Sequence, residues 1–253
     1  MGGRSRSGDC SRRLPVGLRV GRSPTMAQPQ YLPQPLVAWF QCRLLAWAHS
    51  NFRQFPWRET TNPFHILIAE VLLQQTFARK VVPVYSELVF RYPTPQMLAV
   101  ASVADLRALL LPLGFTRRAE RLVELARVLL ERHGGHVPAD IADLLALPGV
   151  GPYTAGAVLA IAFDVRASIP DANVIRVLSR FFGLPVSHRG YANTSSRLLR
   201  SAALEVVPAV DPRKFSLALL DHAALTCTHY RPKCNQCPLS ARCSSVSRGA
   251  SGK

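Results

Sequence analysis

The stretch LPGVGPYTAGA, residues 147–157, places two glycines and a proline between two apolar segments. Gly149 and Gly151 permit backbone conformations and close approaches that a side chain would obstruct. Pro152 suits the first turn of a helix, because its missing N–H would be unpaired there in any case. The stretch therefore predicts a tight turn between two helices, with Tyr153 at the start of the second helix.

The backbone N–H groups of such a turn lie beside a helix N-terminus, which is a favourable place for a phosphate oxygen. Taken alone, a Gly-Val-Gly turn between helices is more often a simple tight connection. The composition favours the phosphate interpretation, because 31 Lys and Arg residues against 15 Asp and Glu residues give a formal net charge of +16. A chain this basic suits a polyanionic partner, most simply nucleic acid.

The chain on either side of this turn, from about residue 35, predicts an all-α protein. Apolar residues recur at spacings of three and four, and no segment shows sustained alternation with period two. Asn62 and Pro63 form a helix-start signal, and we expect the helical segment over residues 63–92 to be interrupted at Pro83. No apolar run reaches the roughly 20 residues that span a bilayer, so we expect no membrane segment.

The N-terminal residues 1–33 are rich in Arg, Gly, Ser and Pro and carry one acid, Asp9. They lack the apolar core of a secretory signal. We expect a disordered basic tail; an organellar transit peptide, or sequence upstream of a start at Met26, are the alternatives. The expected location is cytoplasmic and nucleoid-associated, or organellar or nuclear if the tail is a targeting segment.

Four cysteines near the C-terminus have the spacing C-x6-C-x2-C-x5-C. Four thiolates in so compact a loop can hold one tetrahedral ion or one cubane cluster. A zinc ribbon usually has two C-x2-C pairs, and only one occurs here. The spacing therefore favours a [4Fe–4S] cluster, with zinc or unliganded cysteines as alternatives. The predicted ligands are Cys227, Cys234, Cys237 and Cys243.

Two carboxylates stand in contrasting surroundings. Glu70 is the only acid in the apolar stretch 63–78, and burial would raise its pKa. Asp171 follows Pro170 at a predicted helix start, where the helix dipole favours the ionised form. We expect these environments to push the two pKa values apart, as for an acid and a charge stabiliser. A helix cap for Asp171 and a solvent-facing position for Glu70 are the ordinary alternatives.

In combination these features resemble the helix-hairpin-helix DNA glycosylase superfamily, and within it the iron–sulfur branch of endonuclease III, MutY-type adenine glycosylases and thymine–DNA mismatch glycosylases. The resemblance runs from about Pro35 to Cys243. The motifs that carry it are FPWR, NPF, AEVLLQQT, LPGVGPYTA, IPDANVIRVLSRF and the four cysteines, in that order.

The resemblance implies two helical lobes with the active-site cleft between them. A six-helix lobe containing the helix-hairpin-helix would comprise residues 62–166. The iron–sulfur cluster lobe would comprise residues 34–61 and 167–245, followed by a flexible tail, residues 246–253. The implied partner is double-stranded DNA with a mismatched or damaged base, bound by a monomer.

Two departures from the family pattern refine the expected activity. Endonuclease III-like enzymes carry a Schiff-base lysine at the position of Tyr153, so we expect a mainly monofunctional enzyme with weak or absent AP-lyase activity. MutY-type enzymes continue well past the cluster, whereas this chain ends ten residues after Cys243. Excision of thymine or uracil opposite guanine, leaving an abasic site, is favoured. Endonuclease III-like removal of oxidised pyrimidines, MutY-type adenine excision and non-catalytic damage binding remain alternatives.

The resemblance also implies roles for individual residues. Asp171 would stabilise an oxocarbenium-like sugar, Glu70 would assist the leaving base or position water, and Tyr153 would line the pocket. The residues expected to contact DNA lie in the hairpin, in the QQ pair and in the GFT turn: Gly149, Val150, Gly151, Gln74, Gln75, Phe115 and Thr116.

Overall fold

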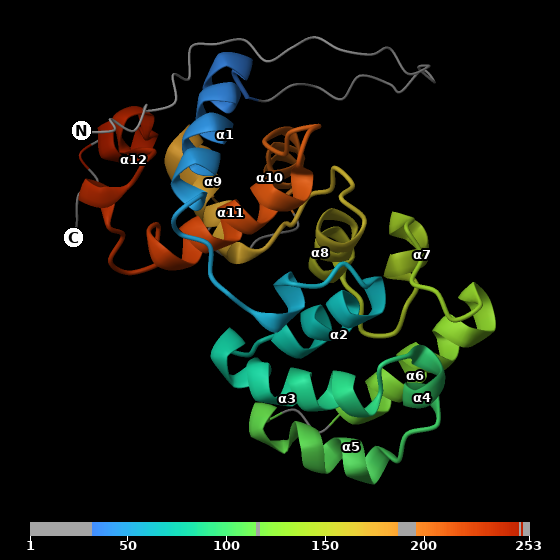
Figure 1. Ribbon diagram of the computed structural model, residues 1–253. Helices are drawn as coiled ribbons and strands as arrows, with labels where there is room; N and C mark the ends of the chain where they lie inside the picture. The colour runs from blue at the N-terminus through green and yellow to red at the C-terminus, as the bar shows by residue number, and fades with distance from the viewer. Residues whose placement is uncertain (1–31, 115–116, 187–195, 248, 250–253) are drawn as a thin grey trace, which may run out of the picture.

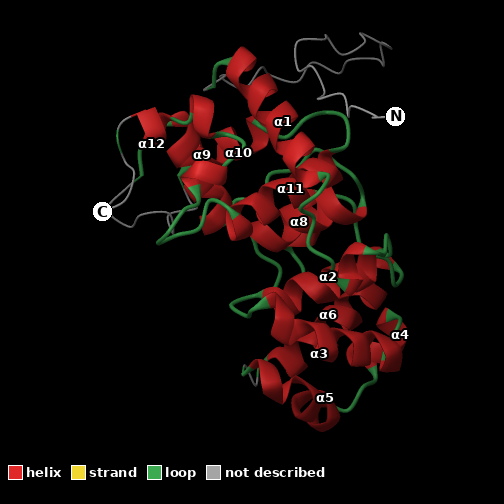
Figure 2. Ribbon diagram, turned by 60° about the vertical axis from the view of Figure 1, so that its left-hand side comes forward, coloured by secondary structure: helices red, strands yellow, loops and turns green. Residues whose placement is uncertain are grey.

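The computed structural model describes residues 32–114, 117–186, 196–247 and 249, and every regular element within them is a helix. The all-α class is therefore confirmed for this part of the chain. Figures 1 and 2 show the helices gathered into two lobes. No helix in the described ranges has the length and apolar character needed to cross a membrane.

The hairpin lobe contains the helices between residues 63 and 162 and encloses one hydrophobic core. Its helices are α2 (Pro63–Leu73), α3 (Ala78–Arg91), α4 (Pro95–Ala99), α5 (Val103–Leu110), α6 (Arg118–His133), α7 (Ile141–Leu145) and α8 (Pro152–Ala162). α4 packs against α6, and α2 packs against α8. α2 is buried on nearly all sides, and fully buried side chains such as Leu67 and Leu72 each stabilise the fold by about 1.5–3 kcal/mol.

The cysteine lobe joins the N-terminal helix to the C-terminal third of the chain (Figure 1). Its helices are α1 (Gln34–Ala48), α9 (Ala172–Phe182), α10 (Arg197–Glu205), α11 (Pro212–Leu225) and α12 (Ser244–Ser247). The second hydrophobic core lies here and is centred on aromatic rings. The ring centroid of Phe40 lies 4.9 Å from that of Phe181 and 6.2 Å from that of Phe215.

Several helix boundaries follow from local signals in the sequence. Asn62 Oδ1 accepts hydrogen bonds from the N–H groups of Phe64 (2.9 Å) and His65 (3.3 Å), so Asn62 caps α2 as expected. Gly134 and Gly183 follow the last residues of α6 and α9 with φ values of +58° and +73°. These left-handed conformations favour glycine and end both helices.

The expected interruption at Pro83 is wrong, because Pro83 lies inside α3. The chain breaks earlier, at residues 74–77, where Gln75 has φ +55°. The carbonyl oxygens of Leu72 and Gln74 accept hydrogen bonds from the Arg118 guanidinium of α6. A tertiary contact therefore satisfies the carbonyl groups at the end of α2, and the helix stops there.

The two lobes meet where α8 packs against α11. The segment that joins α8 to α9 crosses α8 at Gly156, and a Cβ added to Gly156 would clash with the carbonyl oxygen of Ser168. Only glycine permits this close approach. The crossing fixes the path of the chain three residues before Asp171.

Candidate active site

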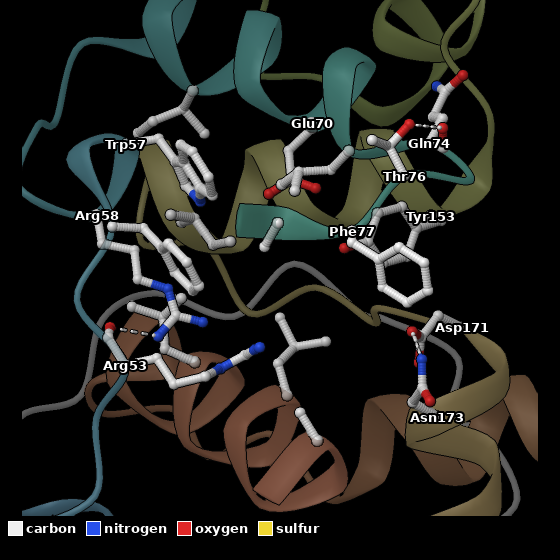
Figure 3. A pocket seen from close by; sticks show the side chains of 18 of the residues that line it. Arg53, Trp57, Arg58, Glu70, Gln74, Thr76, Phe77, Tyr153, Asp171 and Asn173 are labelled. Atoms are coloured by element: carbon white, nitrogen blue, oxygen red, sulfur yellow. Dashed lines mark hydrogen bonds between the residues drawn. The ribbon is translucent and has the colours of Figure 1, made fainter. Parts of the chain in front are cut away.

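A cavity of about 590 Å³ lies between the two lobes. The hairpin lobe contributes Glu70 from α2 and Tyr153 from α8, while Asp171, at the start of α9, comes from the other side (Figure 3). Three of the predicted site residues, distant in sequence, thus line one cavity. Gln74 and Gln75 line it too.

Glu70 is only 3% exposed, which excludes the solvent-facing alternative. Burial raises the pKa of its carboxyl to about 7. A hydrogen bond with Tyr153 and the positive charge of Arg58 oppose this rise, whereas the negative charge of Asp171 adds to it. Among the described residues, Glu70 Oε2 has no hydrogen-bond partner. The raised pKa expected from the sequence is confirmed, and this group can hold a proton near neutral pH.

Asp171 combines the helix-cap alternative with a place in the cavity. Its Oδ1 accepts a hydrogen bond from the N–H of Val174 (2.6 Å), and its Oδ2 accepts one from Asn173 Nδ2 (2.9 Å). Burial nevertheless raises the pKa of Asp171. The expectation that its surroundings favour the ionised form is therefore wrong in direction: these hydrogen bonds and the charge of Arg176 do lower the pKa, but desolvation outweighs them.

A chain of hydrogen bonds connects Asp171 to the first cysteine. Asn173, which donates to Asp171, accepts from Arg176 Nη1 at 2.8 Å. Arg176 also donates from Nε to the Cys227 carbonyl and from Nη2 to the Ala223 carbonyl, both at 2.9 Å. Sequence reasoning missed Arg176. The available signal was the spacing of Asn173, Arg176 and Arg180, which places the three polar side chains on one face of a mostly apolar helix.

Tyr153 is the second residue of α8. Burial, followed by the negative charges of Glu70 and Asp171, raises the pKa of its hydroxyl well above the usual value. Tyr153 therefore remains a neutral phenol that can hydrogen-bond to Glu70. No lysine is found among the described residues that line the cavity.

The turn between α2 and α3 is fixed to the hairpin. Gln74 Nε2 donates to the carbonyl of Gly149 (2.9 Å) and to Thr154 Oγ1 (3.2 Å). From the other side, the guanidinium of Arg118 donates to the Gln74 carbonyl and to Thr76 Oγ1 (3.1 Å). Arg118, which sequence reasoning missed, is 6% exposed, and burial lowers its pKa. The amide of Gln74 is thus already hydrogen-bonded to other residues of the chain.

In the hairpin turn, Gly149 has φ +77°, as its sequence position suggested. The N–H of Val150 donates to the Leu147 carbonyl (3.1 Å), and its side chain is 7% exposed. The N–H of Val150 thus closes the turn, and contact of Val150 with DNA stays a prediction. Within the described part of the chain, the N–H groups of Gly149 and Gly151 donate no hydrogen bond. The expected wedge residues Phe115 and Thr116 lie outside the described residues.

The remaining wall of the cavity carries a buried ionic cluster that sequence reasoning did not assign. Asp221 is fully buried and pairs with Arg58 (Nη1 to Oδ2, 2.6 Å) and Arg53 (Nε to Oδ1, 2.5 Å). Burial alone would raise the pKa of Asp221, but the two guanidinium groups hold it below its usual value. Two cations share one anion, so this wall is positive. Phe55 and Trp57 stack beside it, with ring centroids 4.8 Å apart.

The four cysteines gather in the loop after α11, around the short helices η4 (Cys234–Gln236) and η5 (Ser240–Arg242), and all four are half-buried. Burial, followed by the charges of Cys227 and Cys243, raises the pKa of Cys234. Four soft sulfur donors in one loop fit an iron–sulfur cluster or zinc. In the described ranges, however, no three ligating side chains are already placed to hold a metal ion.

Comparison with known proteins gives a consistent result. The model of the HhH-GPD superfamily base excision DNA repair proteins matches residues 68–201. A thymine/uracil-DNA glycosylase of Methanothermobacter thermautotrophicus is 36% identical over 206 residues, covering 81% of this chain and 92% of the relative. An adenine DNA glycosylase of Mycobacterium tuberculosis is 39% identical over 222 residues, covering 83% and 70%.

A solved structure shares the architecture as well as the sequence. The structure of a thermostable thymine-DNA glycosylase superposes with a TM-score of 0.79 at 34% identity, covering 85% of this chain and 98% of that one. The likeness therefore includes both lobes.

Proposed function

The chain belongs to the HhH-GPD superfamily of base excision DNA repair proteins, and we propose that it is a DNA N-glycosylase that releases thymine or uracil opposite guanine. The observation that carries this proposal is the cavity between the lobes. It places Glu70 and Asp171 on opposite walls with Tyr153 between the lobes and no lysine among its described lining residues. An extrahelical nucleoside could enter it, and chemistry on a paired base requires such extrusion.

DNA would be held at the hairpin. The N–H groups of Gly149 and Gly151 lie at the N-terminus of α8, and a phosphate oxygen can accept from both. The side chain of Gln74 donates a hydrogen bond to the carbonyl of Gly149, which connects the hairpin turn to the turn between α2 and α3. The phosphate site and the mouth of the cavity are therefore held together. One copy of the chain would bind one mismatched duplex.

Asp171 would stabilise the positive charge that develops on the sugar as the N-glycosidic bond lengthens. Both of its oxygens accept hydrogen bonds, and the charge of Asp171 raises the pKa of Glu70. We therefore expect Asp171 to lose its proton before Glu70 does. A fixed anion of this kind stabilises a transition state by an amount worth about 10²–10³ in rate.

Glu70 would carry the proton. With a pKa of about 7, it can protonate the departing base while the electron pair of the glycosidic bond moves to the base nitrogen. Water then adds to the sugar carbon and returns a proton to Glu70. The products are a free base and an abasic site, and Tyr153 orients Glu70 throughout.

We propose that strand cleavage is weak or absent. A lyase step needs an amine to form a Schiff base with the sugar, and the residue at the mouth of α8 is the neutral phenol of Tyr153. The expected result is strand breakage only after alkali. Borohydride trapping of a covalent adduct without alkali would contradict this.

The four cysteines would hold a [4Fe–4S] cluster. When bound, the cluster links four points of the loop, and Arg176 and Arg180 connect that loop to α9 by bonds to Cys227 and Thr228. The protein should then be brown and contain iron. Stoichiometric zinc in a colourless protein would support the alternative.

A panel of duplexes tests the substrate. We expect base release from T·G and U·G pairs and little from oxidised pyrimidines. Adenine opposite 8-oxoguanine is the second candidate, because an adenine DNA glycosylase is 39% identical to this chain. Release of adenine alone would replace the first proposal by the second, and release of no base from any duplex would contradict both.

A further inference from the structure

Phe77 stands apart from the other residues of the cavity. It precedes α3 and lines the cavity, yet 81% of it is exposed. In the view of Figure 3 it lies between Tyr153 and Asp171. Of the described residues that line the cavity, it is the one large apolar side chain left mostly in solvent.

Exposure alone does not single out a functional residue, since isolated apolar side chains are common on surfaces. Phe90, near the other end of α3, is 82% exposed and does not line the cavity. What distinguishes Phe77 is its place at the opening through which an extruded base would pass. Phe90 therefore provides a matched control on the same helix.

Phe77 is also held firmly in place. The residues just before it are fixed by Arg118, which binds the Gln74 carbonyl and Thr76 Oγ1, and by the Gln74 amide, which binds the hairpin. The carbonyl of Phe77 accepts from the N–H of Lys80 at 2.9 Å. Its backbone thus needs no rearrangement to meet a ligand, and little conformational entropy is lost on contact.

We infer that Phe77 packs on the face of the extruded base and retains it in the cavity, an inference that rests on the proposed function. Phe77 is available to contact the base, whereas the amide of Gln74 is already hydrogen-bonded to Gly149 and Thr154. Aromatic stacking on a base tolerates any base, since every base has a π face. Phe77 therefore contributes retention, while the choice of base falls to the polar groups deeper in the cavity.

Two duplexes test this inference. The first contains a target nucleoside that resists hydrolysis, such as a 2′-fluoro analogue opposite guanine, and the second has a tetrahydrofuran abasic analogue at the same position. Phe77→Ala should weaken binding to the first by about tenfold to a hundredfold. Binding to the second should change little, because the second has no base to stack on.

The matched variants sharpen the outcome. Phe90→Ala should leave both affinities unchanged, and Phe77→Trp should restore tight binding to the base-containing duplex. Equal losses on both duplexes would show that Phe77 contacts the backbone or enters the helix, and would overturn the inference. No loss on either duplex would overturn it as well.

Failure of the inference and failure of the proposed function are distinguishable. The affinity comparison needs no catalysis, whereas the proposed function fails if the wild-type chain releases no base. Because Phe77 is exposed, its substitution should leave the thermal unfolding temperature unchanged. If Phe77→Ala lowers the unfolding temperature, Phe77→Leu replaces it in the test. For the inference to stand, Phe77→Leu must weaken binding to the base-containing duplex and leave binding to the tetrahydrofuran duplex little changed.

Discussion

The carboxyl groups of Glu70 and Asp171 both line the cavity, Glu70 buried and Asp171 partly exposed, and their surroundings treat the two charges differently. Glu70 sits in the apolar interior of α2, where one of its oxygens has no partner among the described residues. Asp171 stands at the N-terminus of α9, where both oxygens accept hydrogen bonds. Burial raises the pKa of each, but Glu70 has one donor that favours its charged form, the hydroxyl of Tyr153, whereas Asp171 has both the N–H of Val174 and the amide of Asn173. Since desolvation opposes the charge of both groups, the number of hydrogen-bond donors is what separates the charge stabiliser from the proton carrier.

Removing the charge of Asp171 should have the largest effect. Asp171→Asn keeps an N-cap acceptor for Val174, so α9 should remain intact. Base release should fall by about 10²–10³-fold, because the developing sugar cation loses its anion. Single-turnover release from a T·G duplex measures the rate, and affinity for the same duplex should be retained.

Asp140 provides the control for this substitution. It caps α7 by accepting from Ala142 (2.7 Å) and Asp143 (3.2 Å), but it does not line the cavity. Asp140→Asn should therefore leave base release unchanged. If Asp171→Asn behaved like Asp140→Asn, Asp171 would be a cap and nothing more.

Glu70→Gln should have the next largest effect on the rate, about 10²-fold, because the variant cannot transfer a proton. It should also change the pH dependence of stability. The folded pKa of about 7 lies above the usual 4.5, so ionisation opposes folding, and wild-type stability falls as the pH rises between these values. Above pH 7 this loss is on the order of 3 kcal/mol.

Glu70→Gln should not show this fall in stability, because the glutamine side chain does not ionise. Relative to wild type, Glu70→Gln should gain stability from about pH 4.5 to pH 7, with no pH-dependent gain below that range. Urea unfolding at a series of pH values measures the difference. Glu87→Gln, on the exposed face of α3, is the control. A Glu70→Gln difference that does not vary with pH would contradict the burial argument.

Local chemistry explains what could be predicted from the sequence. Asn62 caps α2, glycines end α6 and α9, and the isolation of Glu70 among apolar residues indicated its raised pKa. These signals need only a few neighbouring residues. The helical class follows from the local spacing of apolar residues, and the family resemblance follows from short motifs and their order along the chain.

The rest depended on contacts between distant segments. Arg118 ends α2 from 44 to 46 residues away, and Arg58 meets Asp221 across 163 residues. The break at residues 74–77 was missed because its cause lies on α6. The pKa of Asp171 was misjudged for a similar reason: the helix terminus was visible in the sequence, but the desolvation of Asp171 in the folded protein was not.

Breaking the hydrogen bonds by which Arg176 connects the cysteine loop to Asn173 should have a smaller effect on base release. Arg176→Gln removes the guanidinium that holds Asn173, so Asp171 should lose its orientation and base release should fall by between about tenfold and a hundredfold. DNA affinity should be unchanged. Arg180→Gln is the comparison, because Arg180 binds Thr228 and Cys227 but not Asn173. Equal rate losses in both variants would indicate general loosening of the loop.

The smallest effect concerns Tyr153. Its hydrogen bond lowers the pKa of Glu70, so Tyr153→Phe should raise that pKa further above 7. The rate at neutral pH should change only a few-fold. The pH profile of single-turnover release measures the shift. A profile that stays in place, or moves to lower pH, would remove Tyr153 from the role of orienting Glu70.

The central claim is that the cavity keeps Glu70 protonated up to neutral pH beside an ionised Asp171. Infrared difference titration of wild type against Glu70→Gln tests it directly, because only a protonated carboxyl shows the acid carbonyl band. The band assigned to Glu70 should disappear near pH 7 and be missing from the variant. Loss of that band near the ordinary glutamate pKa of 4.5 would contradict the account.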